Sequence, residues 1–194
     1  MREELHIGAK QTVILFLGRL NFDKGIPELA EAFAGLAECR EDVVLVLVGA
    51  EEDFPFTRVQ QLCGVFRDRL RRVSFTPTPE RYMAASDIFC LPSHREGFGQ
   101  VIIEAAACGV PTVATRIYGI TDVVVDGETG LLFPVGNVAM LTQHLLKLID
   151  DAALRHLMGE AAHARALELF SSEKITRGMQ DLYGELLERH NANN

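Results

Sequence analysis

The sequence has no long apolar run, no excess of basic side chains and no apolar N-terminus. Its apolar run at 43–48 has the length of a strand, well short of the roughly 18 apolar residues that span a membrane. Nineteen basic against 27 acidic side chains give a net charge of −8, which argues against a nucleic-acid partner. The first residues lack the apolar core of a secretory signal, so we expect neither export nor a transmembrane segment.

Cysteines are few and scattered, which argues against a disulfide framework or a zinc site. The four thiols, Cys39, Cys63, Cys90 and Cys108, form no Cys-x-x-Cys pair, and no histidine follows at ligand spacing. Cys90 and Cys108 lie in apolar settings. We therefore expect buried, reduced thiols in a cytoplasmic protein.

The composition is that of an ordinary globular domain, with 48% apolar and 24% charged residues in 194. At about 100–200 residues per domain, this length predicts one large domain. Apolar runs of strand length recur, with the little alternation typical of strands buried on both faces. These expected strands are 12–17, 43–48, 73–75, 88–91 and 112–114.

Segments of helical period alternate with these runs, at 27–39, 58–72, 79–85 and 101–108. Alternating strands and helices predict an α/β fold with a parallel sheet and right-handed crossovers. After 130–134 the pattern becomes helical only. We expect helices there at 138–149, 152–170 and 172–189. No Gly/Ser linker interrupts the chain, so we predict a single domain over 1–194 with a helical C-terminal annex at about 138–190.

In such a sheet, ligands bind outside the carboxyl ends of the strands, so the loops after the strands are candidates for a site. The loop after the first strand runs from Gly18 to Gly25 and carries Arg19 and Lys24 just before a helix. A helix N-terminus favours anions, and these side chains add a planar fork and a point charge. Two cations suit a diphosphate better than a monophosphate. Alternatively, both are solvated surface charges.

The loop at 92–101 reads Pro-Ser-His-Arg-Glu-Gly-Phe-Gly-Gln-Val. Gly97 and Gly99 let the backbone approach a ligand closely at a helix start. Farther along, Glu104 lies in an apolar helix, where a carboxylate is costly unless it is paired. The two vicinal hydroxyls of a ribose would satisfy both its oxygens. Alternatively, it pairs with a basic side chain elsewhere or lies at a helix edge.

The stretch from Glu96 to Glu104 is a glutamate, seven residues and a second glutamate, followed by Ala-Ala-Ala-Cys-Gly-Val-Pro-Thr. It resembles the donor-binding motif of retaining glycosyltransferases of the group-1, or family-4, type. Other landmarks occur in the order that the family has. They are Gly18-Arg19-Leu20 with Lys24-Gly25, Leu47-Val48-Gly49, the segment 82–87 and the segment 126–132. The resemblance extends from about residue 12 to residue 187.

This resemblance implies the C-terminal, nucleotide-sugar-binding half of a GT-B fold. That half is a Rossmann-like parallel sheet with helices on both faces, and its acceptor-binding N-terminal domain would be absent from this chain. The implied reaction is retaining transfer of a glycosyl group from a nucleotide sugar, most simply a UDP-sugar. The acceptor would be a saccharide or lipid-linked saccharide in polysaccharide or glycolipid biosynthesis. The last helix, 172–189, resembles the segment that packs back towards the N-terminal domain.

By matching position, Arg19 and Lys24 would hold the donor diphosphate and stabilise charge on the leaving phosphate. Glu104 would bind the ribose hydroxyls, and Glu96 would contact the donor sugar. We count Arg19, Lys24 and Glu96 as the catalytic set. The remaining donor contacts, largely backbone groups, would come from Gly18, Phe75, Thr76, Gly97, Phe98, Gly99, Gln100 and Val101.

The mechanism implied for the family has the departing diphosphate help to deprotonate the incoming hydroxyl on the same face of the sugar. We do not favour Glu96 as a nucleophile, because its loop offers no evident activating base. No Asp-x-Asp triplet occurs, so we expect no metal and no further cofactor. His94 either contacts the donor or is a loop histidine bonded to backbone.

The chain departs from the family pattern at 117–122, where one glycine and an aspartate replace the usual Gly-Gly pair and glutamate. This departure favours a hexose or N-acetylhexosamine donor. We expect the isolated domain to be inactive alone. The full-length enzyme would be cytoplasmic, and peripheral at the inner face of the membrane. Two other readings stay open: half of a sugar-nucleotide epimerase, and a nucleotide-binding module without chemistry.

Overall fold

A computed structural model describes residues 1–192 and contains one sheet of six parallel strands, in the spatial order β3-β2-β1-β4-β5-β6. The strands are β1 (Thr12–Leu17), β2 (Val43–Val48), β3 (Leu70–Val73), β4 (Ile88–Leu91), β5 (Thr112–Thr115) and β6 (Gly130–Phe133). The predicted parallel sheet is therefore confirmed. Three of its strands, β1, β2 and β4, begin and end at the predicted residues.

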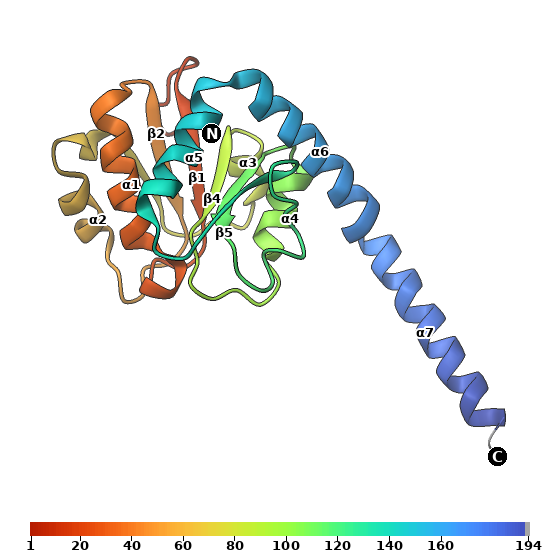
Figure 1. Ribbon diagram of the computed structural model, residues 1–194. Coiled ribbons are helices and arrows are strands. Elements are labelled where there is room, and N and C mark those ends of the chain that lie inside the picture. Colours follow the sequence, from red (N-terminus) through yellow and green to blue (C-terminus); the bar gives the residue numbers. More distant parts are fainter. Residues whose placement is uncertain (193–194) are drawn as a thin grey trace.

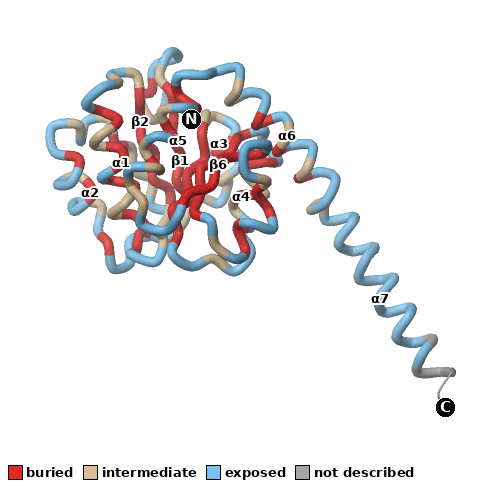
Figure 2. Tube along the Cα trace, in the orientation of Figure 1, coloured by how far each residue is buried: buried red, intermediate tan, exposed pale blue. Residues whose placement is uncertain are grey.

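Helices cover both faces of the sheet, as predicted. They are α1 (Ile26–Cys39), α2 (Phe56–Cys63), α3 (Glu80–Met83), α4 (Gln100–Ala107), α5 (Val138–Asp150), α6 (Ala152–Phe170) and α7 (Ser172–Ala192), with short 3-10 helices η1 (Phe22–Lys24) and η2 (Gly64–Arg69). Helices α1, α2 and α5 pack together on one face, and α3, α4 and α6 on the other (Figure 1). This double cover explains why every residue of the central strands β1, β2 and β4 is buried except Leu17, the last residue of β1, which is partly buried (Figure 2).

The predictions for 58–72 and 73–75 are wrong. Helix α2 stops at Cys63, because Gly64 adopts a φ of 54° and its N–H donates to carbonyls of the last turn. The third strand is Leu70–Val73, which includes two arginines. An edge strand tolerates them because their guanidinium groups donate to main-chain carbonyls, Arg71 to that of Leu5 and Arg72 to that of Gly49.

The sequence pattern does not predict the sixth strand. The segment 130–134 marks only where the expected strands give way to helices. The four residues of β6 pair with β5 from Thr112–Gly130 to Thr115–Phe133. Gly130 is needed there, because a Cβ at this position would clash with the carbonyl oxygen of Thr112. β6 therefore closes the sheet at the edge opposite β3.

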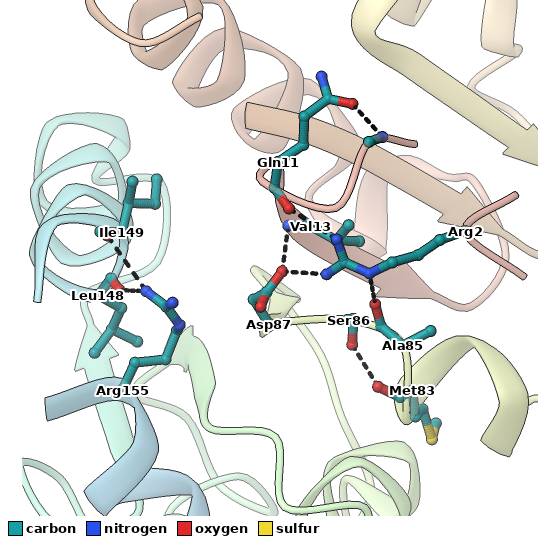
Figure 3. A network of polar contacts seen from close by, with 11 residues as sticks. Arg2, Gln11, Val13, Met83, Ala85, Ser86, Asp87, Leu148, Ile149 and Arg155 are labelled. Carbon is teal, nitrogen blue, oxygen red and sulfur yellow. Dashed lines mark hydrogen bonds and ion pairs between the residues drawn. The ribbon is translucent and has the colours of Figure 1, made fainter. Parts of the chain in front are cut away.

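Two arginines make main-chain contacts away from the ligand-binding edge, Arg2 at the N-terminus of the chain and Arg155 at the junction of α5 and α6. Arg2 donates to the carbonyl oxygens of Ala85 and Gln11 at 2.9 Å and to Asp87 Oδ2 at 2.7 Å (Figure 3). The same carboxylate oxygen accepts from the N–H of Val13 at 2.7 Å. On α6, Arg155 donates to the last carbonyls of α5 (Figure 3). These contacts hold the fold and lie at the end of the strands away from the ligand-binding edge.

The three predicted C-terminal helices are present, and they differ in their packing. α5 buries four apolar side chains in the main core: Leu141, Leu145, Leu148 and Ile149. α6 packs on α4, whereas α7 extends away from the body (Figure 1). α7 exposes apolar side chains three or four residues apart, which places them on one stripe: Ile175, Met179, Leu182, Tyr183, Leu186 and Leu187. Within residues 1–192, no helix combines the length and apolarity needed to cross a membrane.

Candidate functional site

The sheet order reverses between β1 and β4, so the crossovers from these strands lead to opposite faces and open a crevice at their carboxyl ends. The loops that leave the two strands pack against each other through their backbones. Gly25 has a φ of 68°, and a Cβ there would clash with the carbonyl oxygen of Pro92. The N–H of His94 donates to the carbonyl of Asp23 at 2.7 Å. The two loops predicted to carry the chemistry therefore form one unit.

Lys24 and Glu96, both predicted catalytic residues, meet at the join between these loops. Lys24 Nζ lies 2.6 Å from Glu96 Oε2, and the two side chains are only 20% and 15% exposed. Glu96 Oε1 also accepts from the N–H of Gly97 at 3.2 Å. The side chain of Asn21 caps the turn before Lys24 by accepting from its N–H at 2.9 Å. The cation is thus held at a fixed place in the crevice, with a carboxylate as its partner.

Arg19, the other predicted diphosphate ligand, is held by a carboxylate that the sequence reading missed. Its Nη1 lies 2.7 Å from Glu52 Oε1, and the side chains are 64% and 45% exposed. Glu52 comes from the loop after β2, and its other oxygen accepts from Asn21 Nδ2 at 2.5 Å. The acidic run Glu51-Glu52-Asp53 directly after a buried strand was the available signal. Asn21 therefore bridges the two cation sites.

A groove of about 300 Å³ lies beside Arg19, between the ends of β1 and β2 and the chain at 75–79. Its walls include three residues predicted to bind the donor: Gly18, Phe75 and Thr76. The Phe75 ring is largely exposed, so a flat aromatic ligand can stack on it. Gly49 is needed at the floor, because a Cβ there would clash with the carbonyl oxygen of Gly18.

The N-terminus of α4 carries the remaining predicted residues. Gly99 caps the helix with a φ of 65°, and a glycine has no side chain to occupy the first amides, those of Gln100 and Val101. One turn farther, Glu104 is partly buried and its Oε1 accepts from Gln100 Nε2 at 3.2 Å. Glu104 therefore has an amide partner from its own helix, and not the basic partner that was the alternative expectation.

The ring of His94 pairs with a carboxylate, and not with the backbone that was one of the two alternatives; only its main-chain N–H bonds to backbone. Its Nε2 lies 2.7 Å from Glu28 Oε1, in the first turn of α1. The other oxygen of Glu28 is buried and, within residues 1–192, has no hydrogen-bond partner. No local pattern predicts this pair, because the two residues are 66 positions apart.

All four thiols are free, as expected, but the expectation that they are buried is wrong for Cys39, which is exposed, and incomplete for Cys108. Burial raises the pKa of Cys63 to about 11 and raises the pKa of Cys90 strongly. Both core thiols are thus protonated and unreactive at neutral pH. In the part of the chain that the structure describes, no three His, Cys, Asp or Glu side chains are placed to hold a metal ion. The absence of a bound metal remains a prediction.

Comparisons with known proteins give a consistent result. The family model described as glycosyl transferases group 1 matches residues 1–165. The capsular polysaccharide biosynthesis glycosyltransferase CapM of Staphylococcus aureus is 32% identical over 176 residues, which cover 90% of this chain and 46% of CapM. The N-acetyl-alpha-D-glucosaminyl L-malate synthase of Bacillus anthracis is 31% identical over 188 residues, covering 96% of this chain and 49% of that protein.

Among solved structures, Anabaena HepE in complex with UDP-glucose superimposes with a TM-score of 0.84 at 26% sequence identity. The match covers 95% of this chain and 51% of HepE. The chain thus spans about half the length of the curated relatives and solved structures that it matches.

Proposed function

The chain belongs to the glycosyl transferases of group 1, as a C-terminal domain of the GT-B fold, and we propose that it binds the nucleotide-sugar donor of a retaining sugar transfer. One chain of contacts carries this proposal: Arg19 lines the groove, Asn21 links the Arg19–Glu52 pair to Lys24, and Lys24 pairs with Glu96. That order matches a base, a diphosphate and a sugar. Membership of this family sets the epimerase reading aside.

In the proposed complex, Arg19 and Lys24 bind the two phosphates. Both cations already lie beside one carboxylate each, so little reorganisation is needed when the donor binds. Phosphate oxygens replace Glu52 at Arg19, and Lys24 donates to phosphate with the protons that its bond to Glu96 leaves free. As the glycosidic bond breaks, negative charge grows on the leaving diphosphate. Fixed cations and the first amides of α4 stabilise that charge more than they stabilise the bound donor, which is what lowers the barrier.

Glu96 contacts the donor sugar in this proposal and does not attack it. Its two oxygens are engaged by Lys24 and by the N–H of Gly97, which lowers their nucleophilicity. The incoming hydroxyl instead loses its proton to the departing diphosphate on the same face of the sugar, which retains the anomeric configuration. Glu104 binds the ribose hydroxyls, and Phe75 stacks on the base.

We propose a UDP-hexose or UDP-N-acetylhexosamine as the donor. HepE binds UDP-glucose, and the Bacillus anthracis relative is named for an N-acetylglucosaminyl group. The acceptor is a saccharide or lipid-linked saccharide, bound by a second, N-terminal Rossmann-like half against which the apolar stripe of α7 packs. We expect the full enzyme to be cytoplasmic, at the inner face of the membrane. We expect it to use no metal.

Calorimetric titration of this chain with UDP, UDP-glucose and UDP-N-acetylglucosamine tests the proposal. Half a crevice leaves the ligand exposed to water, so we expect dissociation constants of about 10⁻⁵–10⁻³ M. EDTA should change none of them. With a saccharide acceptor added, the chain should transfer no sugar. Failure to bind any of the three ligands at millimolar concentration would contradict the proposal, and so would robust transfer by this chain alone.

A further inference from the structure

The loop proposed to hold the donor sugar has very few side chains by which the rest of the protein can fix it. Between Glu96 and α4 the sequence is Gly97-Phe98-Gly99. A Cβ on Gly97 would meet nothing within 4 Å, and Gly99 adopts a φ of 65°. Phe98 therefore supplies the side-chain contact that can set the position of these amides.

The ring of Phe98 packs on Phe170, the last residue of α6. The two centroids are 6.0 Å apart and the rings are inclined by 76°, an edge-to-face arrangement. Phe98 is 50% exposed, so this pair is not part of the core under the sheet. The contact joins the loop to the C-terminal end of α6, through two residues that are 72 positions apart in the sequence.

The same end of α6 also holds the turn on which the loop rests. Arg165 donates to the carbonyl oxygens of Val123 and Asp122 at 3.0 Å each, and its guanidinium carbon lies 5.8 Å from the centre of the Phe170 ring. The turn containing these carbonyls packs closely under the loop. Gly119 has a φ of 83°, and a Cβ there would clash with the carbonyl oxygens of residues 96 and 97.

The loop is thus held from two sides. On one side, Lys24 anchors Glu96 through their ion pair. On the other, the end of α6 anchors Phe98 directly and the supporting turn through Arg165. The groove and Arg19 belong to β1, β2 and the chain at 75–79, so the α6 contacts bear on the sugar end of the crevice.

We propose that Phe170 and Arg165 are positioning residues, which hold the loop at 96–99 in the geometry that receives the donor sugar. This inference rests on the proposed function. The ring of Phe170 fixes Phe98, and the guanidinium of Arg165 fixes both the ring and the turn beneath. Loss of either contact should loosen the sugar end of the crevice and leave the base and diphosphate end as it is.

Phe170→Ala in the 194-residue chain tests the proposal by two measurements. The first is backbone amide hydrogen exchange of the free protein. Exchange at the N–H groups of Gly97, Ile102 and Ile103, which donate to Glu96 Oε1 and to the carbonyl of Gly99, should accelerate about three- to tenfold, as expected for the loss of one aromatic pair, while exchange at 18–25 stays unchanged. Phe170→Tyr keeps the ring and should exchange as the wild type does. Leu167→Ala, at an exposed position on the same helix, is the matched control and should change neither segment.

The second measurement compares the dissociation constants for UDP and UDP-glucose. Phe170→Ala should raise the dissociation constant for UDP-glucose about three- to tenfold and change that for UDP less than twofold. In a Phe98→Leu background, where the aromatic partner is already gone, Phe170→Ala should cause no further loss of affinity for UDP-glucose. Arg165→Gln should share the selective effect.

Unchanged exchange at the amides of Gly97, Ile102 and Ile103 in Phe170→Ala would overturn the proposal, and so would an equal loss of UDP and UDP-glucose affinity. A wild-type chain that binds neither ligand would contradict the proposed function instead. In that case, the exchange measurement would still decide whether α6 holds the loop.

Discussion

Replacing Arg19 by alanine should weaken the binding of UDP by about 1–2 kcal/mol, or about 5- to 30-fold in the dissociation constant. The magnitude follows from two exposed fractions, 64% for Arg19 and 45% for its partner Glu52. An ion pair this exposed is worth about 0–1 kcal/mol, so it costs little to break when phosphate arrives. A charge-assisted bond to phosphate gains about 1.5–3 kcal/mol. The difference between the two ranges is centred at about 1–2 kcal/mol, which is the predicted effect.

Titration of UDP and of uridine into wild type and Arg19→Ala, each at two ionic strengths, separates this role from a general loss of binding. The variant should lose affinity for UDP and not for uridine, since uridine has no phosphate. Binding of UDP should weaken with salt, and the slope should be smaller in the variant because one charge is missing. Arg19→Lys should recover only part of the loss, because an ammonium group cannot donate as a planar fork does.

If Arg19 is only a solvated surface charge, the variant will bind UDP as tightly as wild type and with the same salt slope. A second refuting pattern is an equal loss for UDP and uridine, which would place Arg19 at the base. The free energy of unfolding provides the control. It should change by less than about 0.5 kcal/mol, because the side chain is exposed.

Four further substitutions or treatments test other parts of the structure. Glu52→Gln keeps the bond from Asn21 and removes the charge that competes for Arg19, so UDP should bind about two- to fivefold more tightly by calorimetry; weaker binding would mean that Glu52 orients the arginine. Glu104→Gln should weaken the binding of UDP by about 1–3 kcal/mol and abolish discrimination against 2′-deoxy-UDP. Equal discrimination by wild type and variant would exclude Glu104 as the ribose ligand. Arg2→Ala should lower the free energy of unfolding in urea by about 1–3 kcal/mol without changing UDP affinity, and an unchanged midpoint would contradict the anchoring role of its network. In the folded protein at pH 8, iodoacetamide should label the exposed Cys39 and spare the buried Cys63. The pKa of Cys63, about 11, keeps it a thiol until the pH rises towards that value. Equal labelling rates would show that Cys63 is accessible.

The sequence was most informative where a segment is buried on both sides. β1 and β2 are unbroken apolar runs because helices cover both faces, and their bounds could be read directly. The two edge strands were harder. β3 carries two arginines, whose bonds to main-chain carbonyls no local pattern reveals, and the helical spacing of 58–72 concealed the turn at Gly64. β6 begins at Gly130 and is followed by Pro134, and these two turn-forming residues obscured the three apolar residues between them.

The candidate site shows the same division between local and tertiary information. Arg19, Lys24 and Glu96 could be selected from the sequence, because each lies on a loop after a strand and in a motif with a fixed spacing. Their partners could not. Whether Lys24 meets Glu96 or Glu52 depends on how three loops fold against one another, which no local pattern records.

The chain's proposed role as a donor-binding domain can be tested by one NMR titration with UDP-glucose, observed at the glycine amides. Glycines lie at every part of the crevice, including Gly18 and Gly49 at the groove and Gly97 and Gly99 at the sugar end. We predict saturable shifts at these four amides, with UDP alone moving mainly the first two. Gly64, on the far side of α2, is the internal control and should not shift. Shifts confined to amides outside the crevice, or no saturable shift at millimolar ligand, would contradict the proposed site.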